Sequence, residues 1–244
     1  MARRTKPPFR ADHVGSLIRP DHLLDARARR HKGDLDDDAL GALLEFGAAG
    51  FEKIRAQPTL FAFWWPRLER VAAWFVVEER RYRETVSRIS SEVKGELVLD
   101  AFTLTATADR VDVLKDGSLS VIDYKTGLVP SKAEVALGFA PQLPLEAAIA
   151  EAGGFEGIDK EEVAQFVYLK LTGGREPGKE KVFAEDMGEV IDATITRLTK
   201  LIHQFDDPAM PYLSQPRPML LERAGDYDHL ARVLEWRGRA EDGT

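Results

Sequence analysis

Three side chains suited to metal-assisted hydrolysis lie within one short stretch of the sequence, residues 106–127. Asp123 and Lys125 are two residues apart, so a β-strand places both side chains on the same face. Asp109 precedes Asp123 by fourteen residues. If the two aspartates lie on neighbouring strands of a hairpin whose loop has an odd number of residues, Asp109 lies on that face as well. An even-length loop would break this arrangement.

Two carboxylates and an ammonium group on one face of a sheet suit phosphodiester hydrolysis. Asp109 and Asp123, helped by the main-chain carbonyl after Asp123, offer the oxygen ligands that Mg²⁺ or Mn²⁺ prefers. Lys125 could orient or deprotonate the attacking water and stabilise the negative charge that develops on the phosphate. The alternative is that these residues, with Arg110 and Asp112, are solvated strand residues that form cross-strand ion pairs. Spacing alone does not separate the two interpretations.

Composition narrows the class of protein. The sequence contains no cysteine, which excludes disulfides, thiolate metal ligands and cysteine nucleophiles. The net charge of -7 argues against a protein that coats nucleic acid through an overall basic surface, so local basic patches matter more than the total. No apolar run reaches the roughly 18 residues that cross a bilayer, and no Walker A loop for an ATP-driven motor is present. We expect a cytoplasmic protein that does not associate with a membrane.

Apolar periodicity predicts the elements that must position these residues. Apolar spacing and a capping box at Ser131 predict helices over residues 39–54, 62–81, 131–138, 142–152 and 191–202. Period-two alternation predicts strands over residues 93–99, 103–114, 118–124, 164–171 and 181–183. The first three strands are expected to be antiparallel, with a turn at residues 115–117, and Pro66 is expected in the first turn of its helix. The sum is an α+β fold with a central mixed sheet flanked by helices.

The motifs in this stretch resemble a known family of enzymes. ADRVD, VIDYKTG and APQLPLEAAI resemble the successive motifs of RecB-family PD-(D/E)xK nucleases. The resemblance extends over about residues 39–236, through the segments AFWWPRLERVAAWF, HQFDDPAMPYLSQPRP and YDHLARVLEW. The sequence of these segments is most similar to the C-terminal nuclease domain of alphaproteobacterial AddB. AddB is a subunit of a helicase-nuclease that acts in DNA double-strand break repair. The resemblance implies a restriction-endonuclease-like core.

The resemblance also implies roles for individual residues. Asp109 and Asp123 match the metal-binding aspartates, Lys125 matches the motif lysine, and Gln142 matches the glutamine of a QxxxY-like motif. Gln142 would begin a helix near the metal and help to position the scissile strand. Glu146 stands where many relatives have tyrosine. An acidic residue there either points away from the metal site or adds to it, and this departure puts the role of that motif in doubt.

Relatives supply one further histidine or glutamate before the hairpin. No histidine lies between His31 and His203. The candidates are therefore Glu78, Glu79 and Glu92, and Glu92 is preferred among them because it opens the first predicted strand. The alternative for each is a surface charge without a role in the site, so none of the three is assigned to it.

From the resemblance we expect a Mg²⁺-dependent deoxyribonuclease, exonuclease-like and related to double-strand break repair, with Mn²⁺ as a substitute metal. The expected partners are DNA and an AddA-type helicase-nuclease subunit. The alternative is a catalytically silent DNA-binding or subunit-docking module of the same fold. An assay of DNA binding and cleavage distinguishes the two hypotheses, because the nuclease binds DNA and cuts it in the presence of the metal, whereas the silent module only binds it.

The N-terminal stretch resembles a different family. PFRADHVGSLIRPDHLLDARAR, residues 8–29, is similar to the start of cobalamin-independent methionine synthase-like proteins. Those enzymes need a large barrel and a zinc site with cysteine ligands, and cysteine is absent here. An acidic run at residues 34–38 marks a composition change. We predict an N-terminal extension over residues 1–38 and a PD-(D/E)xK nuclease domain over residues 39–244.

Overall fold

The computed structural model describes residues 39–211. Its elements in chain order are α2 (Ala39–Gly50), α3 (Glu52–Arg55), α4 (Pro58–Arg83), β1 (Val86–Leu99), β2 (Phe102–Leu114), β3 (Leu119–Lys125), α5 (Lys132–Ala136), α6 (Gln142–Glu151), β4 (Val163–Leu171), β5 (Gly178–Phe183) and α7 (Met187–Asp206). The chain divides into two compact units, Met1–Thr196 and Arg197–Thr244, and the sheet lies in the first. No helix within residues 39–211 has the length and apolar character needed to span a membrane.

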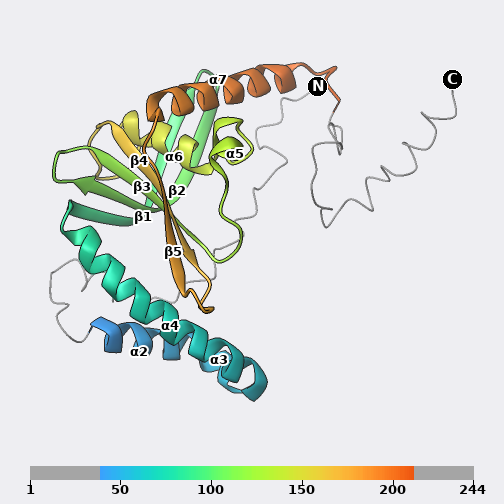
Figure 1. Cartoon of the computed structure of the whole chain (residues 1–244). Coiled ribbons are helices and arrows are strands. Elements are labelled where there is room, and N and C mark those ends of the chain that lie inside the picture. The colour runs from blue at the N-terminus through green and yellow to red at the C-terminus, as the bar shows by residue number, and fades with distance from the viewer. Residues whose placement is uncertain (1–38, 212–244) are drawn as a thin grey trace, which may run out of the picture. The chain divides into compact units, whose positions relative to one another are not determined.

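The five strands form one sheet in the order β1-β2-β3-β4-β5 (Figure 1). Neighbouring strands are antiparallel except β3 and β4, which are parallel. A parallel pair needs a crossover connection, and here that connection contains α5 and α6. The predicted α+β fold with a central mixed sheet flanked by helices is therefore confirmed, as are the three consecutive antiparallel strands.

The loop of the hairpin between β2 and β3 has an odd number of residues, which is the condition for Asp109 and Asp123 to lie on the same face. Val113 pairs with Leu119, so the five residues 114–118 lie between the paired positions. Gly117 adopts a φ of 94°, a left-handed conformation that glycine adopts without steric strain. Continuing the register past the pair Arg110 and Ile122 places Asp109 opposite Asp123. The odd-length loop and the predicted turn are both confirmed.

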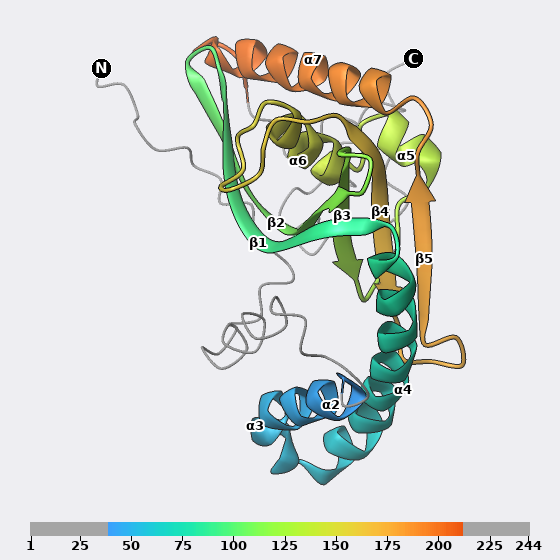
Figure 2. The same ribbon diagram turned by 90° about the vertical axis from the view of Figure 1, so that its left-hand side faces the viewer.

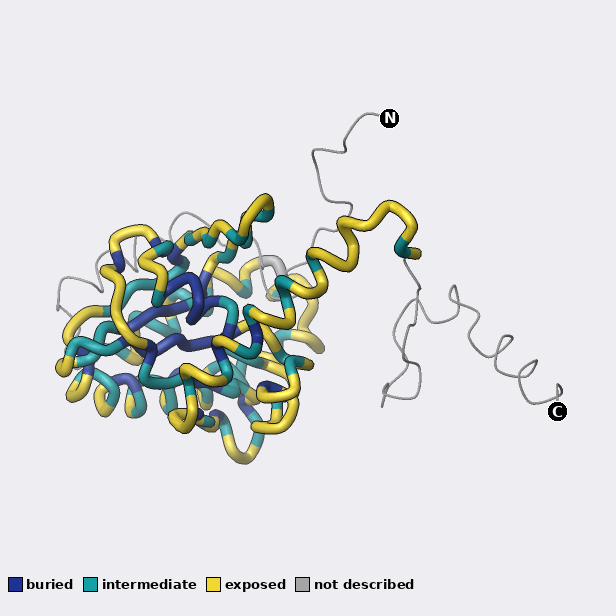
Figure 3. Tube along the Cα trace, turned by 90° about the horizontal axis from the view of Figure 1, so that it is seen from above, coloured by how far each residue is buried: buried dark blue, intermediate teal, exposed yellow. Residues whose placement is uncertain are grey.

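Two apolar clusters cover the two faces of the sheet. On one face Val111, Val121 and Phe166 pack in a core that contains Leu143 and Ile149 of α6. On the other face a smaller group of strand residues packs against aromatic side chains of α4. The strand residues are Ile122, Val167 and Leu169, and the aromatic side chains include Trp74 and Phe75. Figure 3 shows the buried stretches gathered in the sheet region, with exposed loops around them. Residues of opposite parity on β3 therefore face different helices.

A buried ion pair network joins α4 to the sheet. The guanidinium group of Arg110 donates to both carboxylate oxygens of Asp112 (2.7 and 2.6 Å) and to Oε2 of Glu79 (2.6 Å). Arg110 and Asp112 are 1% and 0% exposed. The interpretation of these two as solvated strand residues is therefore wrong, because α4 covers the face on which they lie.

Several predicted element boundaries differ from the structure. The helix predicted over residues 39–54 is two helices, α2 and α3, with Phe51 between them, and both pack against α4 (Figure 2). α4 begins at Pro58, so Pro66 lies in its interior, and the expectation that Pro66 sits in the first turn is wrong. Pro58 occupies that place instead. Strand β1 is predicted to begin at residue 93, but it begins at Val86, because its polar first half also pairs with β2.

Candidate active site

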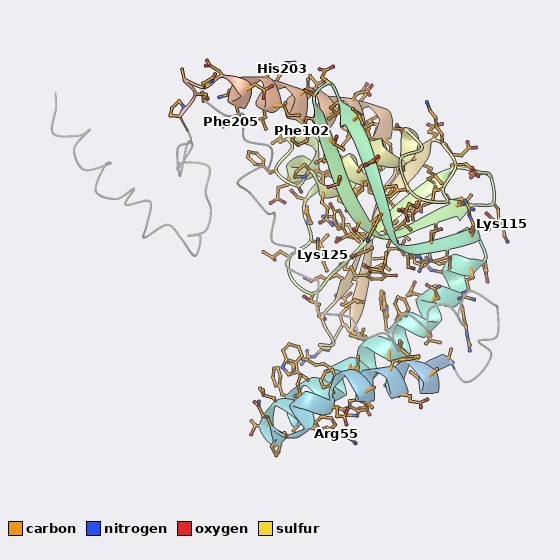
Figure 4. The ribbon with its side chains drawn as sticks, turned by 180° about the vertical axis from the view of Figure 1, so that it is seen from behind. Arg55, Phe102, Lys115, Lys125, His203 and Phe205 are labelled. Carbon is orange, nitrogen blue, oxygen red and sulfur yellow. The ribbon has the colours of Figure 1, made fainter. Side chains whose placement is uncertain are left out.

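Three of the predicted site residues join in one hydrogen-bonded cluster. The ammonium group of Lys125 lies 2.9 Å from Oδ1 and 2.8 Å from Oδ2 of Asp123, and it donates to Oε1 of Gln142 at 2.9 Å. The amide nitrogen of Gln142 in turn donates to Oδ1 of Asp123 at 2.8 Å. Each of the three side chains therefore contacts the other two. Figure 4 shows Lys125 at the end of its strand.

The fourth predicted residue, Asp109, lies across from this cluster on β2. Its Oδ2 accepts a hydrogen bond from the backbone N–H of Tyr124 at 3.2 Å. This bond ties the carboxylate of one strand to the backbone of the next, immediately after Asp123. The structure therefore brings Asp109 to the same end of the hairpin as the other three residues.

The connection after β3 brings Gln142 back to the sheet. Ser131 and Glu134 form the predicted capping box at the start of α5: the Ser131 hydroxyl accepts from the Glu134 N–H at 3.1 Å, and the Glu134 carboxylate accepts from the Ser131 N–H at 2.6 Å. Gln142 is the first residue of α6, as predicted. The apolar residues that follow it are buried in the core on this face of the sheet, and their burial anchors the helix start beside β3.

Burial sets the electrostatics of Asp123, which is only 2% exposed. Burial raises the pKa of this carboxyl, the ion pair with Lys125 opposes that rise, and the charge of nearby Asp109 adds to it. Two carboxylates and one ammonium group thus leave excess negative charge at the site. A divalent cation would neutralise that excess.

Glu146 also belongs to the cluster, although its place was left open by the sequence analysis. It lies one helical turn after Gln142 and is 4% exposed. Its Oε1 accepts a hydrogen bond from the Gln142 amide at 3.2 Å, while its Oε2 is buried without a hydrogen-bond partner within residues 39–211. Burial raises the pKa of this carboxyl to about 8, and the charges of Asp123 and Asp109 contribute. Glu146 therefore points into the site and not away from it.

Tyr168 on β4 was missed by the sequence analysis. It pairs in register with Asp123, and its hydroxyl is buried without a hydrogen-bond partner in the described part of the chain. Burial raises the pKa of this phenol, and Asp123 and Glu146 raise it further. Only a period-two strand pattern was available from the sequence, and it could not reveal which residue of β4 meets Asp123.

The three candidates for an upstream acid lie in different places. Glu78 pairs with Arg81 (2.8 Å), and Glu79 pairs with Arg110 on the α4 face, away from the cluster. Glu92 lies on β1 between Ser91, which pairs with Arg110, and Val93, which pairs with Ala108. Continuing the register between these pairs places Glu92 opposite Asp109. Glu92 also has a φ of 55°, a left-handed conformation that is uncommon for a residue with a side chain.

The donors of the cluster fit a hard divalent cation. Within residues 39–211 no three or more His, Cys, Asp or Glu side chains gather where they could hold a metal ion by themselves. Mg²⁺ does not require such a group, because it is usually held by one or two carboxylates and completes its coordination with water and substrate phosphate oxygens. Asp109 and Asp123 are the two carboxylates that could serve in this way.

Three relatives with matching sequence come from Rickettsia species. They are an uncharacterized protein of Rickettsia bellii (strain RML369-C), Uncharacterized protein RC0550 of Rickettsia conorii and Uncharacterized protein RT0391 of Rickettsia typhi. Each is 32% identical over 96 residues, which is 38% of this chain. The chain covers only 12%, 12% and 11% of their respective lengths in these matches.

Two further comparisons concern structure and family. A solved structure titled "Crystal structure of SSO0001" aligns with 75% of this chain and 85% of its own, at 12% identity and a TM-score of 0.31, which is too low to carry an argument. The family model described as the PD-(D/E)XK nuclease superfamily matches residues 10–217, most of the chain. Since that match includes Asp109, Asp123, Lys125 and Gln142 within one continuous span, the chain belongs to the PD-(D/E)XK nuclease superfamily.

Proposed function

We propose that this chain is a Mg²⁺-dependent deoxyribonuclease whose site consists of Asp109, Asp123, Lys125 and Gln142. The observation that carries the proposal is the mutual contact of Asp123, Lys125 and Gln142, with Asp109 across the hairpin. Nucleases of this superfamily typically use divalent metals such as Mg²⁺ or Mn²⁺. The fold and the chemistry of the side chains thus support the same reaction, hydrolysis of a phosphodiester bond.

Asp109 and Asp123 would hold the metal. When bound, such a metal polarises the phosphate and makes a bound water a stronger nucleophile. Lys125 supplies a fixed positive charge beside Asp123, where it can orient the attacking water and stabilise the negative charge of the transition state. Gln142 accepts from Lys125 and donates to Asp123, so it keeps both groups in one orientation.

The buried carboxyl of Glu146 supports the same assignment. Burial raises the pKa of this carboxyl to about 8, which favours its protonated form at neutral pH in the metal-free site. The protonated form adds no third negative charge beside Asp109 and Asp123. Its contact with the Gln142 amide helps to fix the orientation of that side chain.

A cleavage assay tests the proposal. End-labelled single- and double-stranded DNA is incubated with the wild-type chain in Mg²⁺, in Mn²⁺ and in EDTA, and the products are separated by length. We expect cleavage that EDTA abolishes. We expect Asp123→Asn and Lys125→Gln each to lower the rate by at least about 100-fold, the loss seen when a transition-state contact is removed.

Matched controls lie in the turn between β2 and β3. Asp116→Asn and Lys115→Gln remove the same charges from exposed positions at the far end of the same hairpin. Both controls are expected to cleave at the wild-type rate. Unchanged cleavage in Asp123→Asn and Lys125→Gln would remove the site assignment, and no cleavage by the wild type in either metal would remove the activity.

The second of these outcomes would favour the catalytically silent module. The observations behind that alternative are Glu146 in the place where many relatives have tyrosine, and a Lys125 ammonium already engaged by Asp123 and Gln142. A silent module would bind DNA with a steep salt dependence and leave it uncut.

The wider role is part of the proposal and draws on the sequence resemblance to AddB. It comprises exonuclease-like digestion in DNA double-strand break repair, an AddA-type subunit as partner and a cytoplasmic location. Because the chain covers only 12% of the first relatives it matches, the activity of the whole protein is likewise a proposal. The domain boundary after residue 38 and the methionine-synthase likeness of residues 8–29 stay predictions, since both lie outside the described residues.

A further inference from the structure

A row of three lysines crosses the sheet at the site. Lys125 at the end of β3 pairs in register with Lys170 on β4, and Lys170 pairs with Lys179 on β5. Residues paired in this way direct their side chains to the same face. With about 4.8 Å between neighbouring strands, the row runs for roughly 10 Å from the catalytic lysine to the edge of the sheet.

Lys170 and Lys179, the two lysines beyond Lys125, have no acidic partner within residues 39–211. Lys125 is paired with Asp123, whereas no ion pair with a described residue joins Lys170 or Lys179. Glu180, next to Lys179 on the same strand, contacts Arg81 and the hydroxyl of Tyr82 of α4, on the opposite face. The carboxylate that neighbours Lys179 in the sequence therefore lies away from the row.

This arrangement is unfavourable for the free chain. Like charges that lie directly opposite on neighbouring strands destabilise a sheet. The next lysine along β5, Lys181, is accommodated differently: it pairs in register with Tyr168, and its ammonium group donates to the Pro130 carbonyl at 2.6 Å. Lys170 and Lys179 make no hydrogen bond of this kind with residues 39–211. An anionic ligand laid along the row would offset their repulsion.

We infer that Lys125, Lys170 and Lys179 form a phosphate track, along which the backbone of one DNA strand passes between the edge of the sheet and the scissile position. The inference rests on the proposed nuclease function, and it names how the substrate is held. A single line of cations matches a single phosphate backbone. The track also explains how a chain with a net charge of -7 can bind DNA, because the positive charge is local.

A binding experiment without cleavage tests the track. A fluorescently labelled single-stranded oligonucleotide is titrated with the wild-type chain and with Lys170→Gln/Lys179→Gln in EDTA over a series of salt concentrations. Each phosphate contact on a single strand contributes about 0.7 to the slope of log K against log salt. We expect the slope of the double variant to be smaller in magnitude by about 1.4, with weaker binding to every sequence tested.

Two controls make the result specific. Lys115→Gln removes an exposed lysine from the distant turn between β2 and β3 and is expected to leave slope and affinity unchanged (Figure 4). Lys170→Arg/Lys179→Arg keeps both charges and is expected to keep the wild-type slope. Thermal denaturation of each variant shows whether it is folded. If the glutamine double variant does not fold, the single variants Lys170→Gln and Lys179→Gln are each expected to lower the slope by about 0.7.

The outcomes separate the track from the nuclease activity. An unchanged slope in folded glutamine variants would overturn the track even if the wild type cleaves DNA. A reduced slope in a chain that never cleaves would keep the track and remove the nuclease. A slope that also falls in Lys115→Gln would overturn the track, because overall charge would then explain the binding.

Discussion

The side-chain amide of Gln142 donates a hydrogen bond to the carboxyl group of Glu146, with 3.2 Å between Nε2 and Oε1. The same nitrogen donates to Asp123 at 2.8 Å, so two carboxyl groups share one amide. The other oxygen of Glu146 is buried without a hydrogen-bond partner in residues 39–211. Burial and the charges of Asp123 and Asp109 raise the pKa of Glu146 to about 8, and the hydrogen bond from Gln142 opposes that rise.

The first prediction concerns stability against pH in EDTA. The pKa of Glu146 is raised from 4.5 to about 8 on folding, so the folded chain holds a proton that the unfolded chain has lost. Its contribution to stability is full below pH 4.5 and is lost as the pH rises to about 8. We expect the free energy of unfolding to fall across this window by up to about 1.4 kcal/mol per pH unit. Urea denaturation at successive pH values measures it.

Glu146→Gln supplies the comparison for this prediction, because it keeps the shape of the side chain and cannot ionise. Its free energy of unfolding should depend less on pH between pH 4.5 and 8 than that of the wild type. Asp123 keeps some dependence of the same sign in both proteins, since its pKa is raised as well. Glu161→Gln, at an exposed position before β4, serves as the control. Equal pH dependence in the wild type and Glu146→Gln would contradict the assignment.

Much of the site could be predicted because it depends on local geometry. The pairing of Asp109 with Asp123 follows from strand parity and the length of one short loop. The sequence pattern predicts the two strands, and it predicts the turn that contains Gly117. The start of α6 at Gln142 followed from the motif resemblance and from the apolar residues after it. The contacts within the hairpin therefore needed no knowledge of the tertiary structure, whereas the place of Gln142 beside Asp123 came from the motif resemblance.

The remainder depended on packing between distant segments. Tyr168 meets Asp123 only because β4 returns parallel to β3 through a crossover whose register no local rule fixes. Glu146 lies in a helix with apolar residues on several sides, so the sequence did not show which side faces the sheet. The predicted start of α4 is too late in the sequence, because the prediction places Pro66 in the first turn. The proline that marks the start of this helix is Pro58, the first helical residue.

The second prediction concerns metal binding measured without any substrate. If Asp109 and Asp123 hold Mg²⁺, the metal binds the folded chain and raises its stability, by about 2.7 kcal/mol at a concentration 100-fold above Kd. Thermal denaturation with and without Mg²⁺ should show a higher Tm with the metal. Asp109→Asn should lose the increase, whereas Asp116→Asn in the distant turn should keep it. An equal increase in both variants would show that the metal binds elsewhere.

The third prediction concerns the buried network between α4 and the sheet. Arg110→Met removes the only cation that contacts both Glu79 and Asp112 among the described residues and leaves two buried carboxylates. Breaking a buried ion pair in this way typically costs about 3–5 kcal/mol. Lys132→Met breaks an exposed pair with Glu185 and should cost less than about 1 kcal/mol. Urea denaturation of both variants tests the difference, and similar losses would show that the Arg110 network adds little.

The fourth prediction concerns the close approach of α4 to β5. A Cβ atom added at Gly178 would lie 2.2 Å from Cε3 of Trp74, and the indole ring is packed between α4 and the sheet. Because the indole ring is packed against the strand residues and has little room to swing aside, Gly178→Ala should push the helix and strand apart and cost about 1–3 kcal/mol. Gly127→Ala, where a Cβ atom would meet nothing within 4 Å, should stay within about 0.5 kcal/mol of the wild type. Equal stability of the two variants in urea denaturation would mean that Trp74 is not held against the strand, and α4 would then be anchored mainly by the Arg110 network.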